Sequence, residues 1–241
     1  MKCPHCKSTW TVSADLGMNL RNCPFCGAAL PGYPAFPANA VCRPEDFQFD
    51  DEYPVHGNHT AFIRTLKKYT GTDRIIVIPP GVDYIGAGAF SNCPVWEIYV
   101  PQGLRAIDSS AFKGCHVLRK ISLPGGITSI PPHAFEGCHS LEEIEIPGSV
   151  QIIGSKAFWF CLNLEHVKLR EGVRKIDSQA FAFCNRMRVI EIPDSLEEIH
   201  PNAIHCSEEI QVIASEHWKK AHPDLLNRFY YIHGNWDSGR P

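Results

Sequence analysis

Apolar and polar positions along this chain repeat with a fixed period over most of its length. The clearest mark is an Ala-Phe dipeptide that recurs every 22 or 23 residues and ends in one degenerate copy. The six copies are Ala89-Phe90, Ala111-Phe112, Ala134-Phe135, Ala157-Phe158, Ala180-Phe181 and Ala203-Ile204. A period of this length is typical of proteins built from stacked repeats, each of which is one supersecondary unit.

A strand pattern follows the Ala-Phe pair in each repeat. Segments such as 118–123, 141–146 and 164–169 read L-x-x-I/V-x-I/L. Side chains alternate along a strand, so the first, fourth and sixth positions point inward and the third and fifth point outward. One coil cannot bury its apolar side alone, and neighbouring coils stack at about 4.8 Å. The pattern predicts a leucine-rich-repeat solenoid, mainly β with short helical turns, whose phenylalanine rings stack inside.

The full repeat reads IP-x-x-V-x-x-I-G-x-x-A-F-x-x-C, and residues 150–161 are a good instance. This pattern resembles the BspA-like leucine-rich repeats of bacteria over about residues 69–222. The resemblance implies a first coil beginning at 69–73, a closing strand at 210–212 and a short helix over 214–221. It also implies a binding or adhesive protein, often on the cell surface.

Two C-x-x-C pairs mark the first thirty residues. Cys3 and Cys6 form one pair, Cys23 and Cys26 form the other, and sixteen residues lie between them. This spacing is typical of a four-cysteine zinc site, whereas a redox C-x-x-C needs one pair in a βαβ context. Four thiolates saturate Zn²⁺, so we expect one structural zinc ion per chain. The segment resembles the N-terminal zinc ribbons of many bacterial proteins.

These features divide the chain into three parts. Residues 1–30 form the zinc ribbon, 31–60 a proline-rich acidic linker, and 61–241 the solenoid with its terminal caps. The later part of the linker is apolar enough to pack on the first coil. A modest helical pattern over 61–69 predicts a cap at the N-terminal end of the solenoid.

Composition narrows the function classes. The net charge is −3 and the pI is near 6.4, which gives no global signal for nucleic acid or an anionic membrane. No stretch of 18 apolar residues exists, so no membrane span is expected, and the N-terminus lacks the apolar region of a secretory signal. We therefore expect a cytoplasmic protein. The ribbon carries Lys2, Lys7 and Arg21 against Asp15, a balance that permits nucleic-acid contact without arguing for it.

The cysteines of the solenoid recur in phase with the repeat. Cys93, Cys115, Cys138, Cys161 and Cys184 each follow an Ala-Phe pair by the same spacing. A metal or redox ladder would need the thiols to face one another, whereas stacked side chains point the same way. We expect small, weakly polar side chains that fill a tight buried turn.

No catalytic motif is present: the chain lacks G-x-S-x-G, a P-loop, G-x-G-x-x-G and H-E-x-x-H. We therefore expect a non-enzymatic interaction protein.

The outward strand positions form a mixed, mildly acidic concave face that suits a protein or peptide with basic groups. Its candidate binding residues are Glu97, Tyr99, Lys120, Glu143, Glu145, His166, Lys168 and Glu191. A solvated face without a ligand, a nucleic-acid-associated regulator acting through the ribbon, and a cell-surface adhesin are the alternatives. Trp159-Phe160 predicts a further exposed apolar contact.

Overall fold

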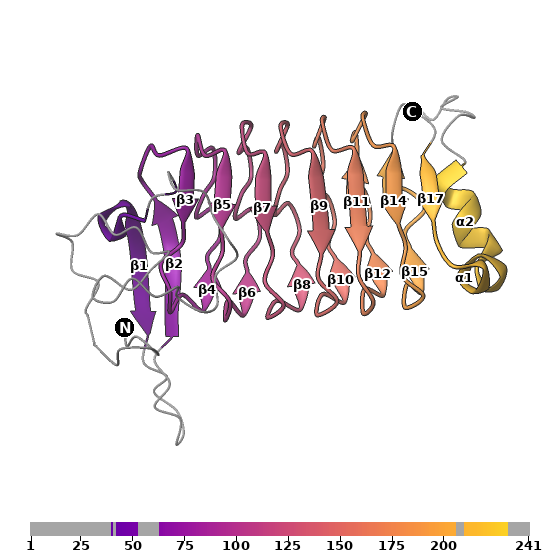
Figure 1. The fold of residues 1–241 in the computed structure, drawn as a ribbon, viewed down its shortest axis with the longest axis horizontal. Coiled ribbons are helices and arrows are strands. Elements are labelled where there is room, and N and C mark those ends of the chain that lie inside the picture. Colours follow the sequence, from indigo (N-terminus) through magenta and orange to yellow (C-terminus); the bar gives the residue numbers. More distant parts are fainter. Residues whose placement is uncertain (1–39, 41, 53–62, 206–209, 231–241) are drawn as a thin grey trace, which may run out of the picture.

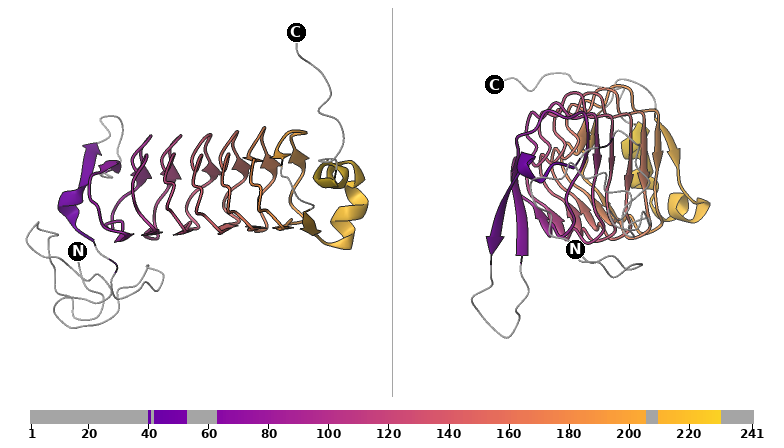
Figure 2. Two further views of the ribbon diagram at one scale, coloured as in Figure 1. Left: turned by 90° about the horizontal axis from the view of Figure 1, so that it is seen from above. Right: turned by 60° about the vertical axis from the view of Figure 1, so that its left-hand side comes forward.

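A computed structural model describes residues 40, 42–52, 63–205 and 210–230. These residues form a row of stacked coils that runs from two N-terminal strands to two C-terminal helices (Figure 1). The row is nearly straight in Figure 1 and in the perpendicular view at the left of Figure 2, so the face expected to be concave is not visibly curved. The predicted zinc ligands Cys3, Cys6, Cys23 and Cys26 lie outside the described residues.

The coils build two faces of parallel strands. The first, which we call the strand face, consists of β3 (Ile75–Val77), β5 (Glu97–Tyr99), β7 (Lys120–Ser122), β9 (Glu143–Ile146), β11 (His166–Leu169), β14 (Val189–Glu191) and β17 (Gln211–Ile213). The second, the return face, consists of the shorter β4 (Tyr84–Ile85), β6 (Ala106–Ile107), β8 (Ser129–Ile130), β10 (Ile152–Ile153), β12 (Lys175–Ile176) and β15 (Glu198–Ile199). Paired residues are one repeat apart, as where Val167 lies between Ile144 and Ile190.

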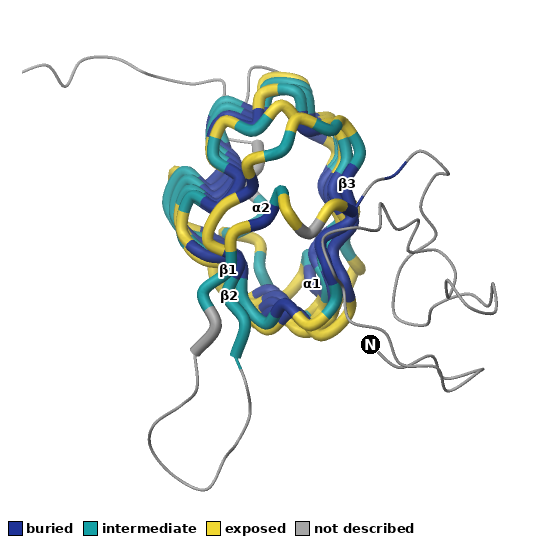
Figure 3. The backbone as a smooth tube through the Cα atoms, turned by 90° about the vertical axis from the view of Figure 1, so that its left-hand side faces the viewer, coloured by how far each residue is buried: buried dark blue, intermediate teal, exposed yellow. Residues whose placement is uncertain are grey.

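The Ala-Phe segments close each coil and stack in its interior, as the repeat predicts. Phe112, Phe135 and Phe158 are fully buried, with ring centroids 4.9 Å and 5.1 Å apart and nearly parallel planes. The ladder continues to Phe90 at 5.2 Å and to Phe181 at 5.1 Å. In the last coils this edge also forms a short pair of strands, β13 (Phe181–Ala182) and β16 (Ile204–His205). Figure 3, a view along the row, shows that buried positions fall at the same places around successive coils.

The N-terminal cap is a pair of strands. The prediction of a helix over 61–69 is therefore wrong for residues 63–69, the described part of that segment. A 3-10 turn, Pro44–Asp46, leads into β1 (Phe47–Glu52), which pairs antiparallel with β2 (Ile63–Tyr69). β2 also pairs with β4, so it supplies the hydrogen bonds that the first return strand requires. The Phe47 ring lies 5.1 Å from that of Tyr69, which stacks on the phenylalanine ladder. The later linker therefore packs on the first coil, as expected.

The C-terminal cap follows the closing strand and helix that the resemblance implied. Helix α1 (Glu216–Ala221) begins after Ser215, whose hydroxyl accepts a hydrogen bond from the Trp218 backbone N–H at 3.0 Å. The Trp218 indole is buried and donates to the Leu196 carbonyl at 2.8 Å. Helix α2 (Pro223–Tyr230) follows, with Leu225 packed against the core. The last coil is thus covered by a large apolar side chain whose polar atom is satisfied.

The in-phase cysteines are buried thiols that hydrogen-bond to the backbone. Cys138 Sγ donates to the Phe112 carbonyl at 3.3 Å, and Cys161 and Cys184 make the same bond to the phenylalanine of the coil before. All three are free thiols. Burial raises the pKa of Cys115 to about 12 and raises the pKa of Cys138 well above its ordinary value. This matches the expectation of a small, weakly polar packing residue.

We predict that these thiols resist alkylation in the native chain. A thiolate is the reactive form, and both burial and a raised pKa suppress it at Cys115, Cys138 and Cys161. Iodoacetamide treatment followed by peptide mass spectrometry should leave them unmodified in buffer and modify all three in urea. Half-buried Cys93 serves as the internal comparison and should react measurably faster. Alkylation of native Cys138 at the rate seen in urea would contradict the buried ladder.

Candidate partner-binding face

The predicted binding residues lie on the strand face because alternation along each strand turns them outward. Lys120, Glu143 and Glu145 are exposed, while Ile121 and Ile144 between them are buried. Glu97, His166, Lys168 and Glu191 are partly exposed on the same face. The structure thus brings seven of the eight predicted residues to one surface.

Tyr99 differs from the expectation of an outward-facing aromatic. Tyr99 is only 6% exposed, and its hydroxyl donates a hydrogen bond to Glu97 Oε2 at 2.7 Å. Trp96, one residue before β5, supplies an accessible aromatic ring at 36% exposure. The Arg74 and Arg119 guanidinium carbons lie 4.9 Å and 5.0 Å from the centre of that ring, a cation–π arrangement. An aromatic therefore does border the strand face, but it is Trp96.

Charged groups on the C-terminal half of the face are largely paired with one another. Glu191 accepts from His166 Nε2 at 2.7 Å and from Lys168 Nζ at 3.2 Å. Glu145 accepts from Arg170 Nε at 2.6 Å. Partial burial raises the pKa of the Glu191 carboxyl, but the hydrogen bonds from Lys168 and His166 outweigh it and hold the pKa below its ordinary value.

We predict that Glu191 contributes to acid sensitivity. Because its pKa is lower in the folded state, the unfolded chain binds the proton first, so stability is lost as pH falls through the folded-state pKa. Glu191→Gln removes this step and should flatten the dependence of the urea midpoint on pH below about pH 5. Glu197→Gln, on the return face and paired with Arg174, is the charge-matched control. Parallel curves for wild type and Glu191→Gln would remove the proposed linkage.

The strand face is interrupted between β7 and β9. Strands β3, β5 and β7 form one sheet, and β9, β11, β14 and β17 form another. At other coil boundaries the residue before the strand donates to the previous coil, as from Arg119 to the Trp96 carbonyl at 2.8 Å and from Glu165 to the Glu142 carbonyl at 2.8 Å. Among the described residues the corresponding bond from Glu142 to Arg119 is not formed. We call this break the seam.

The return face is interrupted one strand earlier, between β6 and β8. Other coils join here through a backbone N–H, as from Asp108 to the Ile85 carbonyl and from Gly154 to the Ile130 carbonyl, both at 2.8 Å. The equivalent position in the intervening coil is Pro131, which has no N–H to donate. The coil that contains β7 and β8 therefore pairs with the preceding coil through β7 and β5, and with the following coil through β8 and β10. The phenylalanine ladder and the bond from Phe112 to Ala134 remain continuous across it.

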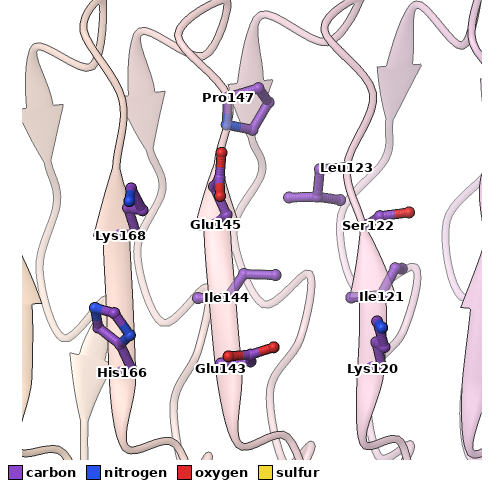
Figure 4. A pocket seen from close by; sticks show the side chains of 10 residues that line it. All are labelled: Lys120, Ile121, Ser122, Leu123, Glu143, Ile144, Glu145, Pro147, His166 and Lys168. Carbon is purple, nitrogen blue, oxygen red and sulfur yellow. The ribbon is translucent and has the colours of Figure 1, made fainter. Parts of the chain in front are cut away.

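A groove of about 460 Å³ opens on the strand face at the seam. Figure 4 shows Lys120 and Ser122 on β7 and Glu143 and Glu145 on the neighbouring strand β9, with Leu123 between the two strands. The residue at the matching position of the next coil, Ile146, is fully buried, whereas Leu123 is only partly buried. The volume lies in the range of about 300–1,000 Å³ that ligand pockets occupy. The sequence pattern gave no direct sign of this groove; Pro131 was the one local signal that the coil departs from its neighbours.

Two of the charged side chains that line the groove are not neutralised by ion pairs within the described part of the chain. Among the described residues, neither Lys120 nor Glu143 forms an ion pair. They stand on opposite walls, so the groove presents a cation on one side and a carboxylate on the other. Glu142 and Arg119 continue this polarity into an adjoining depression of about 420 Å³. The seam thus combines free charges of both signs with backbone groups that are not paired across it.

A second surface feature lies along the Ala-Phe edge. Phe160 and Phe183 stack with ring centroids 4.7 Å apart, and Trp159 meets Phe160 edge-on at 4.3 Å. Both phenylalanines adopt positive φ, near 60°, where the equivalent residues of earlier coils are Gly114 and Gly137. The predicted Trp159-Phe160 spot exists, but its rings are half-buried against one another.

The described residues form a leucine-rich-repeat solenoid, a class of repeat protein that generally serves as a protein-interaction scaffold. Six copies of a model described as the BspA type leucine-rich repeat region match residues 83–211, which is more than half of the chain. The chain belongs to this family. A search of curated proteins finds no match.

Solved structures support the same architecture. A leucine-rich repeat protein from T. pallidum is 25% identical, with a TM-score of 0.57, over 75% of this chain and 94% of that one. A leucine-rich cell surface protein from Faecalibacterium prausnitzii is 27% identical, with a TM-score of 0.53, over 79% of this chain and 42% of that one. The pneumococcal vaccine antigen PcpA, at 18% identity and a TM-score of 0.58, over 68% of this chain and 44% of that one, shares the fold. Within the described part of the chain, no helix has the length and apolarity needed to span a bilayer.

Proposed function

We propose that this chain is a non-catalytic interaction module whose strand face binds a protein or peptide partner. The observation that carries the proposal is the arrangement of Lys120, Glu143 and Glu145 as exposed side chains on neighbouring strands of one face. Repeat solenoids place such rows on one extended face, where they contact a partner over many residues. Charge on such a face contributes chiefly to specificity and to the rate of association.

Charge reversal on the two faces tests this proposal. The full chain and a Glu143→Lys/Glu145→Lys variant are used to capture partners from the native cell, with quantitative mass spectrometry of what is bound. Glu197→Lys/Glu198→Lys is the matched control, since it makes the same change of charge on the return face. It breaks the ion pairs to Arg174 and Lys175, whereas the strand-face variant breaks only the pair between Glu145 and Arg170. A partner retained by wild type and control but lost by the strand-face variant supports the proposal. Equal capture by all three chains contradicts it.

The N-terminal cysteines add an adaptor module to the proposal. The spacing of Cys3, Cys6, Cys23 and Cys26 suits one tetrahedral structural Zn²⁺, whose binding energy would fold a segment too short for its own core. Metal analysis of the purified full chain should give one zinc per chain. Cys3→Ser/Cys6→Ser should lose the metal, while Cys138→Ser should retain it. A ratio well below one in the unmodified chain excludes the ribbon.

Two alternatives make different predictions. A nucleic-acid-associated regulator requires an affinity for DNA or RNA that falls steeply with salt and depends on the ribbon. A cell-surface adhesin is favoured by the similar F. prausnitzii structure, which is described as a cell surface protein. Fractionation of the native cells distinguishes the adhesin from a cytoplasmic interaction module.

A further inference from the structure

Three side chains near the N-terminal end of the strand face form a stack of cation, aromatic ring and cation. Arg74, Trp96 and Arg119 each precede the strand of their coil, and backbone N–H groups bond Trp96 to Arg74 at 2.6 Å and Arg119 to Trp96 at 2.8 Å. The two guanidinium carbons lie 4.9 Å and 5.0 Å from the centre of the Trp96 ring. Because one arginine comes from the coil before and the other from the coil after, the ring lies between them. We call these three residues the Arg-Trp-Arg stack.

The stack holds two cations at the surface without neutralising them. Arg74, Trp96 and Arg119 are exposed, and neither arginine forms an ion pair with any described residue. A guanidinium that packs on a ring uses the face of its plane, so the N–H donors at its edge remain available to bind an anion. Packing also restricts the side chain and so reduces the entropy that binding costs. The stack is therefore a preorganised pair of anion-binding groups.

The free charge of the strand face changes sign along the row. Lys120 adds a third cation next to Arg119, whereas the coil that contains β9 presents the exposed carboxylates Glu142, Glu143 and Glu145. These cations and carboxylates lie on opposite sides of the seam. A partner that lies along the row therefore meets positive charge over β3 to β7 and negative charge over β9.

A nucleic acid suits this arrangement less well than a protein segment. Proteins that hold single strands stack bases on aromatic rings, but guanidinium groups already lie on both sides of Trp96. A continuous phosphate chain would also pass Glu97, which lies on β5 among the cations, and then the carboxylates of β9. A short run of aspartate or glutamate residues can end before the seam and be followed by basic residues.

We propose that the Arg-Trp-Arg stack binds an acidic segment of the protein partner, whose carboxylates accept hydrogen bonds from Arg74 and Arg119. Basic residues that adjoin this segment lie over Glu142 and Glu143, so the charge pattern sets which end of the partner segment faces β3. The inference rests on the proposed function of the strand face and adds the chemistry and the orientation of its partner. Positions two coils apart are about 10 Å apart, the length that four residues of an extended chain span.

Designed peptides test the proposal on the full chain. A fluorescein-labelled block peptide carries four glutamates followed by four lysines, and an alternating Glu-Lys peptide of the same composition is its control. The Kd is measured by fluorescence anisotropy at low ionic strength, where exposed charges are least screened. A labelled oligothymidine provides the comparison with nucleic acid.

Three variants locate the binding on the chain. Arg74→Gln/Arg119→Gln removes both cations of the stack from exposed positions. Arg105→Gln/Arg174→Gln is the matched control, because it removes two exposed cations beside strands of the return face. Trp96→Leu keeps both arginines and removes the ring between them. Circular dichroism and thermal melting establish that all three variants fold.

The block peptide should bind the wild-type chain at least about fivefold more tightly than the alternating peptide. Arg74→Gln/Arg119→Gln should raise its Kd at least about tenfold, while the return-face control leaves it unchanged. Trp96→Leu should raise the Kd about threefold, the size of effect of an exposed cation–π contact.

Several results would overturn the acidic-segment site. They are a block peptide that does not bind or is not preferred over the alternating one, and a Kd that stays unchanged in Arg74→Gln/Arg119→Gln or in Trp96→Leu. Oligothymidine that binds more tightly than the block peptide and is lost in the arginine variant would assign the stack to nucleic acid instead.

Failure here is distinguishable from failure of the proposed function. A cellular partner that is lost by Glu143→Lys/Glu145→Lys but retained by Arg74→Gln/Arg119→Gln would leave the strand face as the binding surface and remove the stack from it. A partner that is retained by both variants would remove the strand face itself.

Discussion

Replacing Phe135 by alanine will lower the free energy of unfolding by about 3–5 kcal/mol. Its ring is fully buried between those of Phe112 and Phe158, at centroid distances of 4.9 Å and 5.1 Å. Both neighbours are held by their own coils, so neither can fill the space that the ring leaves. The cost therefore includes the lost burial and the cavity that remains.

The measurement is urea unfolding of the full chain followed by far-ultraviolet circular dichroism. Phe135→Leu keeps most of the apolar volume and should lose clearly less stability than Phe135→Ala. Ile152→Ala removes an aliphatic side chain that is 42% exposed, so it should change the free energy by less than about 1 kcal/mol. Equal losses at Phe135 and Ile152 would mean that the interior ladder does not hold the coils together.

Replacing Gly172 by alanine will cost about 2–4 kcal/mol, from two separate causes. Its φ is +115°, a backbone conformation that side chains with a Cβ rarely adopt. A Cβ built there would also lie 1.9 Å from the Gly148 carbonyl oxygen of the preceding coil. The two coils must move apart to admit a methyl group, and this disturbs the packing beneath them.

Gly81→Ala separates the two causes. Gly81 also has positive φ, at +81°, but a Cβ there would have no atom within 4 Å. Its replacement should therefore cost only the conformational part, about 1–2 kcal/mol. In urea unfolding, the midpoint of Gly172→Ala should be well below the midpoint of Gly81→Ala. Identical midpoints would show that the close approach of the two coils contributes nothing.

The N-terminal cap shows why a local pattern can mislead. The apolar spacing through Phe62, Leu66 and Tyr69 suits a helix and predicts a helical cap. In the structure, Leu66 pairs with Ile85 of the first return strand, while Glu52 pairs with Ile63 on the other side. An exposed sheet edge requires a partner, and this tertiary requirement overrides the weak helical preference.

Some features of the candidate binding face could likewise be predicted from the sequence, and others could not. Outward positions such as Glu143 and Glu145 were predictable, because alternation along a strand depends only on neighbouring residues. Tyr99 is buried and its hydroxyl donates to Glu97, whereas the accessible aromatic is Trp96, which lies between arginines of the coils before and after it. Such contacts join different side chains at each coil, so a repeat consensus does not reveal them.

The solenoid could be predicted from the amino-acid sequence, together with its inward and outward positions, the phenylalanine ladder and the buried thiols. These features follow from two periodicities that short stretches of sequence already display. Side chains alternate with a period of two along each strand, and the repeat recurs about every 23 residues. The tertiary structure alone decided the cap of β1 and β2, the break between β7 and β9, and the groove at that break. They depend on whether backbone groups one coil apart reach each other, and that distance is set by the packing of the whole stack.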